Sequence, residues 1–135
     1  MTQEEKELLL KDLCGRLPYK TYVKTTKGIG YVYAINTSQL IELSIANNSE
    51  YWSEVFNINE IKPYLRPMSS MTEEEYKELK SISPYYGFAP YKFIGDWCPN
   101  YEMTDWLNAH HFDYRGLIEK GLAIAVTEEN NPYKE

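Results

Sequence analysis

The sequence predicts a single α+β domain with an N-terminal helix, a small SH3-like β-barrel and a C-terminal helical part that includes a short strand. Three observations support this fold class. The first residues have the apolar spacing of an amphipathic helix, residues 19–67 hold short β-rich runs between turn residues, and helical patterns return after residue 72. The length of 135 residues fits one domain, 1–135.

The N-terminal helix is expected over residues 1–15. Thr2 and Glu5 have the spacing of a capping box, in which the hydroxyl and the carboxylate each satisfy a backbone amide. Gly15 follows in the position of a C-cap. The apolar residues of this segment fall close to one helical face: Leu9, Leu10, Leu13 and Cys14.

Residues 19–67 are predicted to form the SH3-like barrel. Lys27-Gly28-Ile29-Gly30 has the composition of a turn, and Asn59-Glu60-Ile61 is expected to form a 3₁₀ turn before a short fifth strand near Tyr64. An order of four strands, a tight turn and a short fifth strand is typical of such barrels, and the analogy implies no function. Four runs have strand composition: Thr21–Thr26, Tyr31–Ile35, Leu40–Ile45 and Tyr51–Phe56.

The C-terminal part is expected over residues 72–127. Thr72 and Glu75 form a second capping-box pair, which predicts a helix at 73–80. Trp106 and Leu107 are expected to point inward from a later helix, and Asp113 to cap another. The later elements follow in this order: a short strand at Tyr91–Ile94, helices at Met103–His110 and Tyr114–Lys120, and a strand at Leu122–Val126.

Composition and charge exclude several classes of protein. The net charge of −6 argues against a general binder of the phosphate backbone. No apolar run approaches the roughly 20 residues of a membrane-spanning helix, and the acidic N-terminus does not resemble a secretory signal. Cys14 and Cys98 form no paired motif, so a disulfide framework is not expected. We therefore expect a soluble, cytoplasmic protein.

Two longer phrases carry a resemblance to a known family. They are Ile61–Glu75 and Thr104–Ile124, and the opening residues Lys11–Cys14 and Arg16–Pro18 fit the same pattern. They resemble an uncharacterised family of short proteins from anaerobic gut bacteria, their prophages and their mobile elements. The resemblance covers about half of the chain. It implies a bacterial mobile-element context and no known activity, cofactor or catalytic residue.

The residue types used in catalysis and metal binding form no recognised pattern. His110 and His111 are adjacent, so on a helix they would point about 100° apart, and neither Cys98 nor Asp113 completes a zinc ligand spacing. The nucleophile elbow, the phosphate-binding loop and the dinucleotide fingerprint are all missing. We therefore expect neither an enzyme nor a bound metal or cofactor.

A basic segment gives one functional hypothesis. Lysines interleaved with tyrosines can neutralise a nucleic-acid backbone while bases stack on the rings, which would suit a nucleic-acid-associated accessory protein. The other interpretation is a solvated strand whose lysines protect a sheet edge from pairing. The residues concerned are Arg16, Lys20, Tyr22, Lys24 and Lys27.

An aromatic segment at residues 81–101 gives the preferred hypothesis. Tyrosine and tryptophan are enriched in protein interfaces, so the sequence favours a non-catalytic module that binds another protein or a second copy of itself. The other interpretation is that the rings fasten this segment onto the barrel while the Tyr hydroxyls reach water. The interface candidates are Tyr85, Tyr86, Phe88, Tyr91 and Trp97.

Overall fold

The computed structural model describes residues 1–36, 38, 40–47, 50–82 and 101–133, and it confirms an α+β fold that opens with a helix. The helices are α1 (Gln3–Arg16), α2 (Glu73–Ile82) and α3 (Tyr101–Ala109), and 3₁₀ turns lie at Leu17–Tyr19, Ile58–Glu60 and Met68–Ser70. The strands are β1 (Tyr22–Thr25), β2 (Gly28–Ile35), β3 (Leu40–Asn47), β4 (Glu50–Asn57), β5 (Lys62–Pro67), β6 (Phe112–Asp113) and β7 (Ile124–Ala125).

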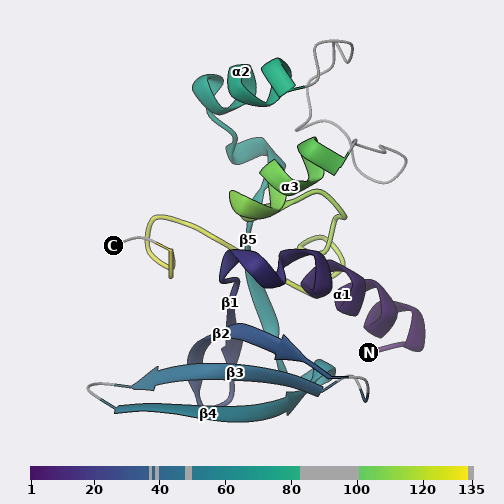
Figure 1. The fold of residues 1–135 in the computed structure, drawn as a ribbon, viewed down its shortest axis with the longest axis vertical. Helices are drawn as coiled ribbons and strands as arrows, with labels where there is room; N and C mark the ends of the chain where they lie inside the picture. Colours follow the sequence, from purple (N-terminus) through teal and green to yellow (C-terminus); the bar gives the residue numbers. More distant parts are fainter. Residues whose placement is uncertain (37, 39, 48–49, 83–100, 134–135) are drawn as a thin grey trace.

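The strands form one open mixed sheet, so the prediction of a closed SH3-like barrel is wrong. β4, β3, β2 and β1 pair as an antiparallel meander, and β5 joins β1 through two residue pairs, Val23–Pro63 and Lys24–Lys62. Beyond these pairs β5 runs parallel to β6 and β7. Figure 1 shows β5 leaving the meander toward α3. The barrel does not close because most of β5 pairs with the C-terminal strands.

The four predicted β-rich runs are confirmed as β1 to β4, but the first turn is tighter than expected. Only Thr26 and Lys27 lie in the turn, and Gly28 and Gly30 belong to β2. Gly30 faces Ile45 on β3, and a Cβ at Gly30 would stand 2.7 Å from the carbonyl oxygen of Ser44. The glycine therefore permits β2 and β3 to approach closely here, which is why it lies within a strand.

The capping box that begins α1 is confirmed. The amide of Thr2 donates to the Glu5 carboxylate at 2.8 Å, and the amide of Glu5 donates to the Thr2 hydroxyl at 3.1 Å. Two other expectations for this helix are wrong. The helix continues through Gly15 to Arg16 instead of stopping at a glycine cap, and Cys14 is exposed instead of lying on the apolar face.

The apolar core has two parts. In the first, Leu9 and Leu13 of α1 pack with one face of the meander, which carries Ile41, Leu43 and Ile45. These β3 residues alternate in burial with Glu42 and Ser44, as a sheet covered on one face requires. The second part lies between α2, α3 and β6, at the opposite end of the molecule in Figure 1, and contains Met68, Leu79, Met103, Trp106, Leu107 and Phe112.

The C-terminal part matches the sequence in some elements only. The capping box of α2 is confirmed by bonds between Thr72 and Glu75, and Trp106 and Leu107 are buried as expected. Residues 114–120 do not form the predicted helix. They are irregular and end in turns, in which Asp113 accepts hydrogen bonds from the amides of residues 117 and 118. The last predicted strand shortens to β7, and the one predicted at 91–94 lies outside the described residues.

Candidate functional site

The preferred interface candidates from the sequence lie outside the part of the chain that the structure describes. These residues are Tyr85, Tyr86, Phe88, Tyr91 and Trp97. An interaction through residues 81–101 therefore stays a prediction. The surface that the structure does describe is formed by the sheet and the three helices.

Arg16 does not belong to the proposed basic surface. Its side chain is fully buried, donates from Nε to Asp12 at 2.7 Å and also donates to the carbonyl oxygen of Phe112. Burial lowers the pKa of Arg16 more than any other single effect changes it, but the charge and the hydrogen bonds of Asp12, together with Tyr114 and Asp113, raise it by more, so the pKa is raised. A guanidinium held in this way is not accessible to a nucleic acid, so Arg16 has a structural role in this fold.

Of the other members of the basic segment, Lys20 and Tyr22 share a contact with the Tyr31 ring, and Lys27 is bound elsewhere. The Lys20 ammonium lies 4.7 Å from the centre of the Tyr31 ring, and Tyr22 meets the same ring edge-on at 5.9 Å. Lys27 forms an ion pair with Glu54 on β4 at 2.8 Å. Lys24 is exposed on β1 and makes no such pair among the described residues. The structure therefore brings Lys20 and Tyr22 together at Tyr31 but occupies Lys27 with a carboxylate.

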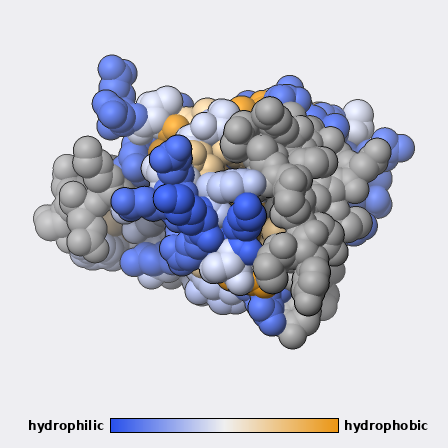
Figure 2. All heavy atoms as spheres, turned by 90° about the horizontal axis from the view of Figure 1, so that it is seen from above, coloured by the Kyte–Doolittle hydropathy of each residue, from blue (hydrophilic) through white to orange (hydrophobic). Residues whose placement is uncertain are grey.

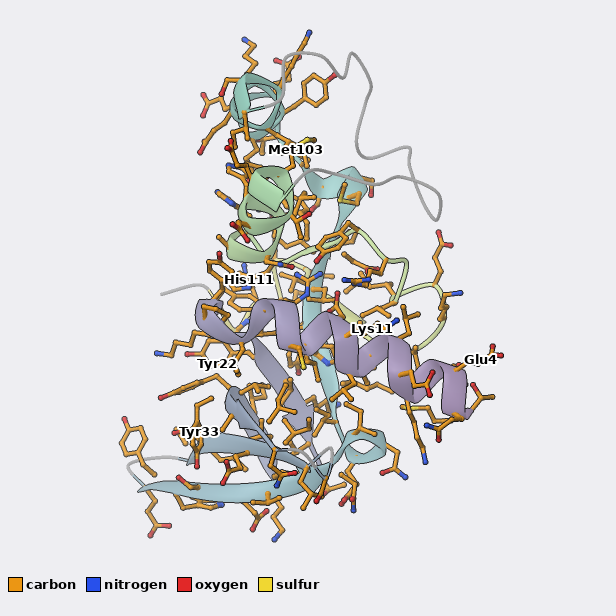
Figure 3. All side chains as sticks on the ribbon, turned by 45° about the vertical axis from the view of Figure 1, so that its right-hand side comes forward. Glu4, Lys11, Tyr22, Tyr33, Met103 and His111 are labelled. Atoms are coloured by element: carbon orange, nitrogen blue, oxygen red, sulfur yellow. The ribbon has the colours of Figure 1, made fainter. Side chains whose placement is uncertain are left out.

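The outer face of the meander carries exposed apolar side chains. On β2, Ile29 and Tyr33 are 42% and 45% exposed, and on β4, Tyr51 and Val55 are 78% and 47% exposed. Apart from Met1 at the chain start, these four are the large apolar side chains classed as exposed among the described residues. By contrast, Figure 2 shows the view from above, where hydrophilic residues predominate and apolar areas are small. Figure 3 labels Tyr33 and Tyr22 at the β1–β2 part of the sheet.

Strand register explains why Tyr51 and Val55 share this outer face. Tyr51 opposes Ala46 and Val55 opposes Glu42, and both partners alternate along β3 with the buried residues Leu43 and Ile45. Trp52 and Phe56 therefore point toward the α1 side and Tyr51 and Val55 away from it. On the face of the sheet that points away from the core, the edge strand β4 therefore carries apolar side chains.

β4 is also the edge of the sheet. All eight of its residues pair with β3 in an unbroken register, and no described strand pairs with its other side. β4 contains no proline or lysine, the residues that usually protect an edge, and its charges are Glu50 and Glu54. Lys27 neutralises Glu54. An unbroken, nearly uncharged edge can accept another strand by backbone hydrogen bonding.

The two histidines stack on different aromatic rings. His110 stacks on Trp106 at 4.0 Å, and His111 stacks on Tyr133 at 3.7 Å. Figure 3 places His111 between α3 and the C-terminal end of α1. Burial lowers the pKa of His111 to about 4, and the charge of Arg16 adds to this effect. Within the described residues, no three His, Cys, Asp or Glu side chains are grouped to hold a metal.

Comparison with protein-family models, with curated proteins and with solved structures found no match to this chain. In the described part of the chain, no helix has the length and apolar character needed to cross a bilayer. The family resemblance and the mobile-element context accordingly stay predictions.

Sequence reasoning missed the β4 edge, although part of its signal was present. The alternation of Tyr51, Ser53 and Val55 with Trp52, Glu54 and Phe56 shows a strand that is apolar on both faces. What the sequence does not reveal is that β4 lies at the edge, because that depends on where β5 pairs.

Proposed function

We propose that this protein is a non-catalytic interaction module that self-associates by adding β4 of a second copy to the free edge of its own β4. The observation that carries the proposal is the coincidence of a free, unbroken edge with two exposed apolar side chains, Tyr51 and Val55, on that edge. The partner is a second copy because the pattern of β4 is complementary to itself.

The self-complementarity follows from the spacing of β4 residues. In a two-fold antiparallel pair, each residue opposes the one equally distant from the centre on the other strand. Centring the pair on Ser53 places Tyr51 opposite Val55 of the partner, twice. An aromatic residue opposite a β-branched residue is a favourable cross-strand pair, worth roughly 0.2–1 kcal/mol. On the other face the same register places Trp52 opposite Glu54, and Glu50 opposite Phe56.

Neighbouring registers bring like charges together. Centring on Trp52 would place Glu50 opposite Glu54, and centring on Glu54 would place this carboxylate opposite itself. Like charges directly opposite each other destabilise a strand pair. Moving the centre farther toward either end of β4 shortens the paired segment, since β4 has only eight residues. The Ser53 register is therefore the longest one free of carboxylate pairs.

The nucleic-acid alternative has weaker support. Of its five residues, Arg16 is buried and Lys27 is bound to Glu54, which leaves Lys20, Tyr22 and Lys24. The net charge of −6 also repels a polyanion. We therefore give self-association as the function and treat nucleic-acid binding as an outcome that the experiment below can detect.

The experiment is sedimentation equilibrium of the wild type and of two double variants. Tyr51→Lys with Val55→Lys places two lysines opposite each other in the Ser53 register, so we expect a dimeric wild type and a monomeric variant. The matched control is Ile29→Lys with Tyr33→Lys, which makes the same charge change on the outer face but two strands away from the edge. The control should remain dimeric.

Charge complementation sharpens the test. Mixing Tyr51→Lys/Val55→Lys with Tyr51→Glu/Val55→Glu should restore a dimer that contains one of each, because opposite charges then face each other. Two results would contradict the proposal. One is a wild type that stays monomeric at about 100 μM, and the other is a control variant that dissociates as fully as the β4 variant. Dimerisation that appears only with added single-stranded DNA would favour the alternative.

A further inference from the structure

A hollow of about 420 Å³ opens where the β1–β2 turn, the 3₁₀ turn before β5, and β7 meet. Its lining combines cationic, hydroxyl and amide side chains with two apolar ones: Lys24, Thr26, Asn59, Lys62, Ile61 and Ile124. The volume falls within the range of small-molecule sites, which is about 300–1,000 Å³. The hollow lies on β1 and β5, on the far side of the meander from the β4 edge.

The unusual feature of the hollow is a pair of facing lysines. Lys24 and Lys62 are direct partners in the antiparallel register of β1 and β5. Like charges in this position destabilise a sheet unless something lies between them or compensates them. Both side chains are exposed, and neither makes an ion pair with a described residue. The arginines Arg16, Arg66 and Arg115 and the lysine Lys27, in contrast, each have a carboxylate within 4 Å.

The carboxylate in the lining of the hollow belongs to Glu60 and is hydrogen-bonded to Asn57. Oε1 of Glu60 accepts from the backbone amide of Asn57 at 3.0 Å and from the Asn57 side chain at 2.9 Å. These bonds hold the carboxylate at the N-terminus of the 3₁₀ turn. The lining therefore keeps a positive charge, and the hydroxyl of Thr26 and the amide of Asn59 have no hydrogen bond within the described residues.

We propose that this hollow binds the phosphate group of a small phosphomonoester, with Lys24 and Lys62 on either side of the phosphate. Two ammonium groups and the one carboxylate of Glu60 leave the lining a net charge of +1, which attracts a phosphate dianion, and lysine serves as a point charge for phosphate in many proteins. Thr26 and Asn59 supply neutral donors to the remaining oxygens. Ile61 and Ile124 give an apolar wall for the organic part of the ligand, which the volume of the hollow leaves room for.

The first test is an NMR titration of backbone amides with inorganic phosphate, against chloride at equal ionic strength. We expect the shifts to concentrate at residues 24–26 and 59–62. Lys24→Gln and Lys62→Gln should each weaken binding at least fivefold. Lys20→Gln is the matched control, since Lys20 is an exposed lysine shortly before β1 that already contacts the Tyr31 ring, and it should leave the affinity unchanged.

A thermal measurement separates binding from a structural role. Without phosphate, Lys62→Gln should melt about 1–4 °C higher than the wild type because the repulsion between the lysines is gone. With phosphate the wild type should gain stability with ligand concentration, whereas the variant should need at least fivefold more phosphate for the same gain. Shifts scattered over the surface, or the same phosphate-dependent gain in Lys62→Gln, would overturn the proposal.

The source of the phosphate is distinguished by two further ligands. Glycerol phosphate should bind at least as tightly as inorganic phosphate, because the apolar wall contacts its carbon atoms. A 5′-phosphorylated oligonucleotide that binds far more tightly than glycerol phosphate would overturn the assignment to a small molecule. This site is independent of β4, so Tyr51→Lys/Val55→Lys should bind phosphate like the wild type.

Discussion

Asp12 and Arg16, one helical turn apart on α1, form an ion pair in which neither side chain is exposed to solvent. Nε and Nη2 of Arg16 both donate to the Asp12 carboxylate, at 2.7 and 3.1 Å. Nη2 also donates to the carbonyl oxygen of Phe112 at the start of β6, and Arg115 lies 3.3 Å from the same carboxylate. This pair fastens the N-terminal helix to the C-terminal strands.

Removing one partner of this pair should be costly. Asp12→Ala leaves a buried guanidinium without its counter-charge, and we expect a loss of about 3–5 kcal/mol in the free energy of unfolding. Urea denaturation measures it. Lys27→Gln is the comparison, because it breaks an ion pair that is largely exposed and should cost about 0.2–1 kcal/mol. Equal losses in the two variants would contradict the structural role of Asp12.

His111 should make the stability depend on pH. Burial lowers its pKa from 6.5 to about 4 in the folded protein, so the folded state binds the proton less readily than the unfolded state. The neutral His111 therefore contributes fully to the stability above pH 6.5. As the pH falls from 6.5 to about 4, the free energy of unfolding should decrease by up to about 3 kcal/mol.

Urea titrations at a series of pH values test this dependence. His111→Phe keeps a ring against Tyr133 and should flatten the slope between pH 6.5 and 4, whatever its stability at neutral pH. If His111→Phe retains the full slope, another group is responsible.

Glu75 should also make the stability depend on pH, in a lower pH range than His111 does. It accepts two hydrogen bonds from Arg66, at 2.7 and 2.8 Å, and caps α2 by accepting from the amide of Thr72. The side-chain hydrogen bonds from Arg66 lower the pKa of Glu75 to about 2. Its stabilisation is therefore present above pH 4.5 and is lost as the pH falls from 4.5 to about 2.

Glu75→Gln tests this assignment by calorimetry at pH 7 and pH 2.5. At pH 7 we expect a loss of about 1–3 kcal/mol, since a charged acceptor becomes a neutral one. At pH 2.5 the difference from the wild type should shrink. The neighbouring Glu74→Gln is a control that should change the stability little at either pH, since Glu74 is exposed.

Two glycines should respond to alanine in opposite directions. Gly30→Ala would bring a Cβ within 2.7 Å of the Ser44 carbonyl oxygen, so the strands must separate, at a cost of about 1–3 kcal/mol. Gly15 lies inside α1, and a Cβ there would be 3.4 Å from its nearest neighbour. Gly15→Ala should therefore raise the free energy of unfolding by about 0.5–1 kcal/mol. Thermal denaturation of both variants tests this contrast.

Local features of the fold could be predicted from the sequence. The capping boxes that begin α1 and α2 were predicted, because each depends on residues three positions apart. The four meander strands were also predicted, because alternation along β3 records which face meets the core. In each case the evidence lies within a few residues of the feature itself.

Features that depend on distant residues could not be predicted. The barrel was expected because β1 to β5 have the right order, but β5 pairs with Phe112 and Ile124, far along the chain. The spacing of Asp12 and Arg16 suits an ion pair, yet its burial depends on Phe112. Likewise Lys62 meets Lys24 only through the pairing of β5 with β1, so the hollow had no signal in either segment alone.

The dependence of β5 on residues that follow it by some sixty positions has a consequence for the order of folding. The meander closes through short hairpins, whereas Tyr64 must find Ile124 across a long loop, which is entropically slower. In the interval the sheet has two open sides, at β1 and at β4. Chains that meet during this time can join through either side, so we expect refolding at high protein concentration to give aggregates larger than the proposed dimer.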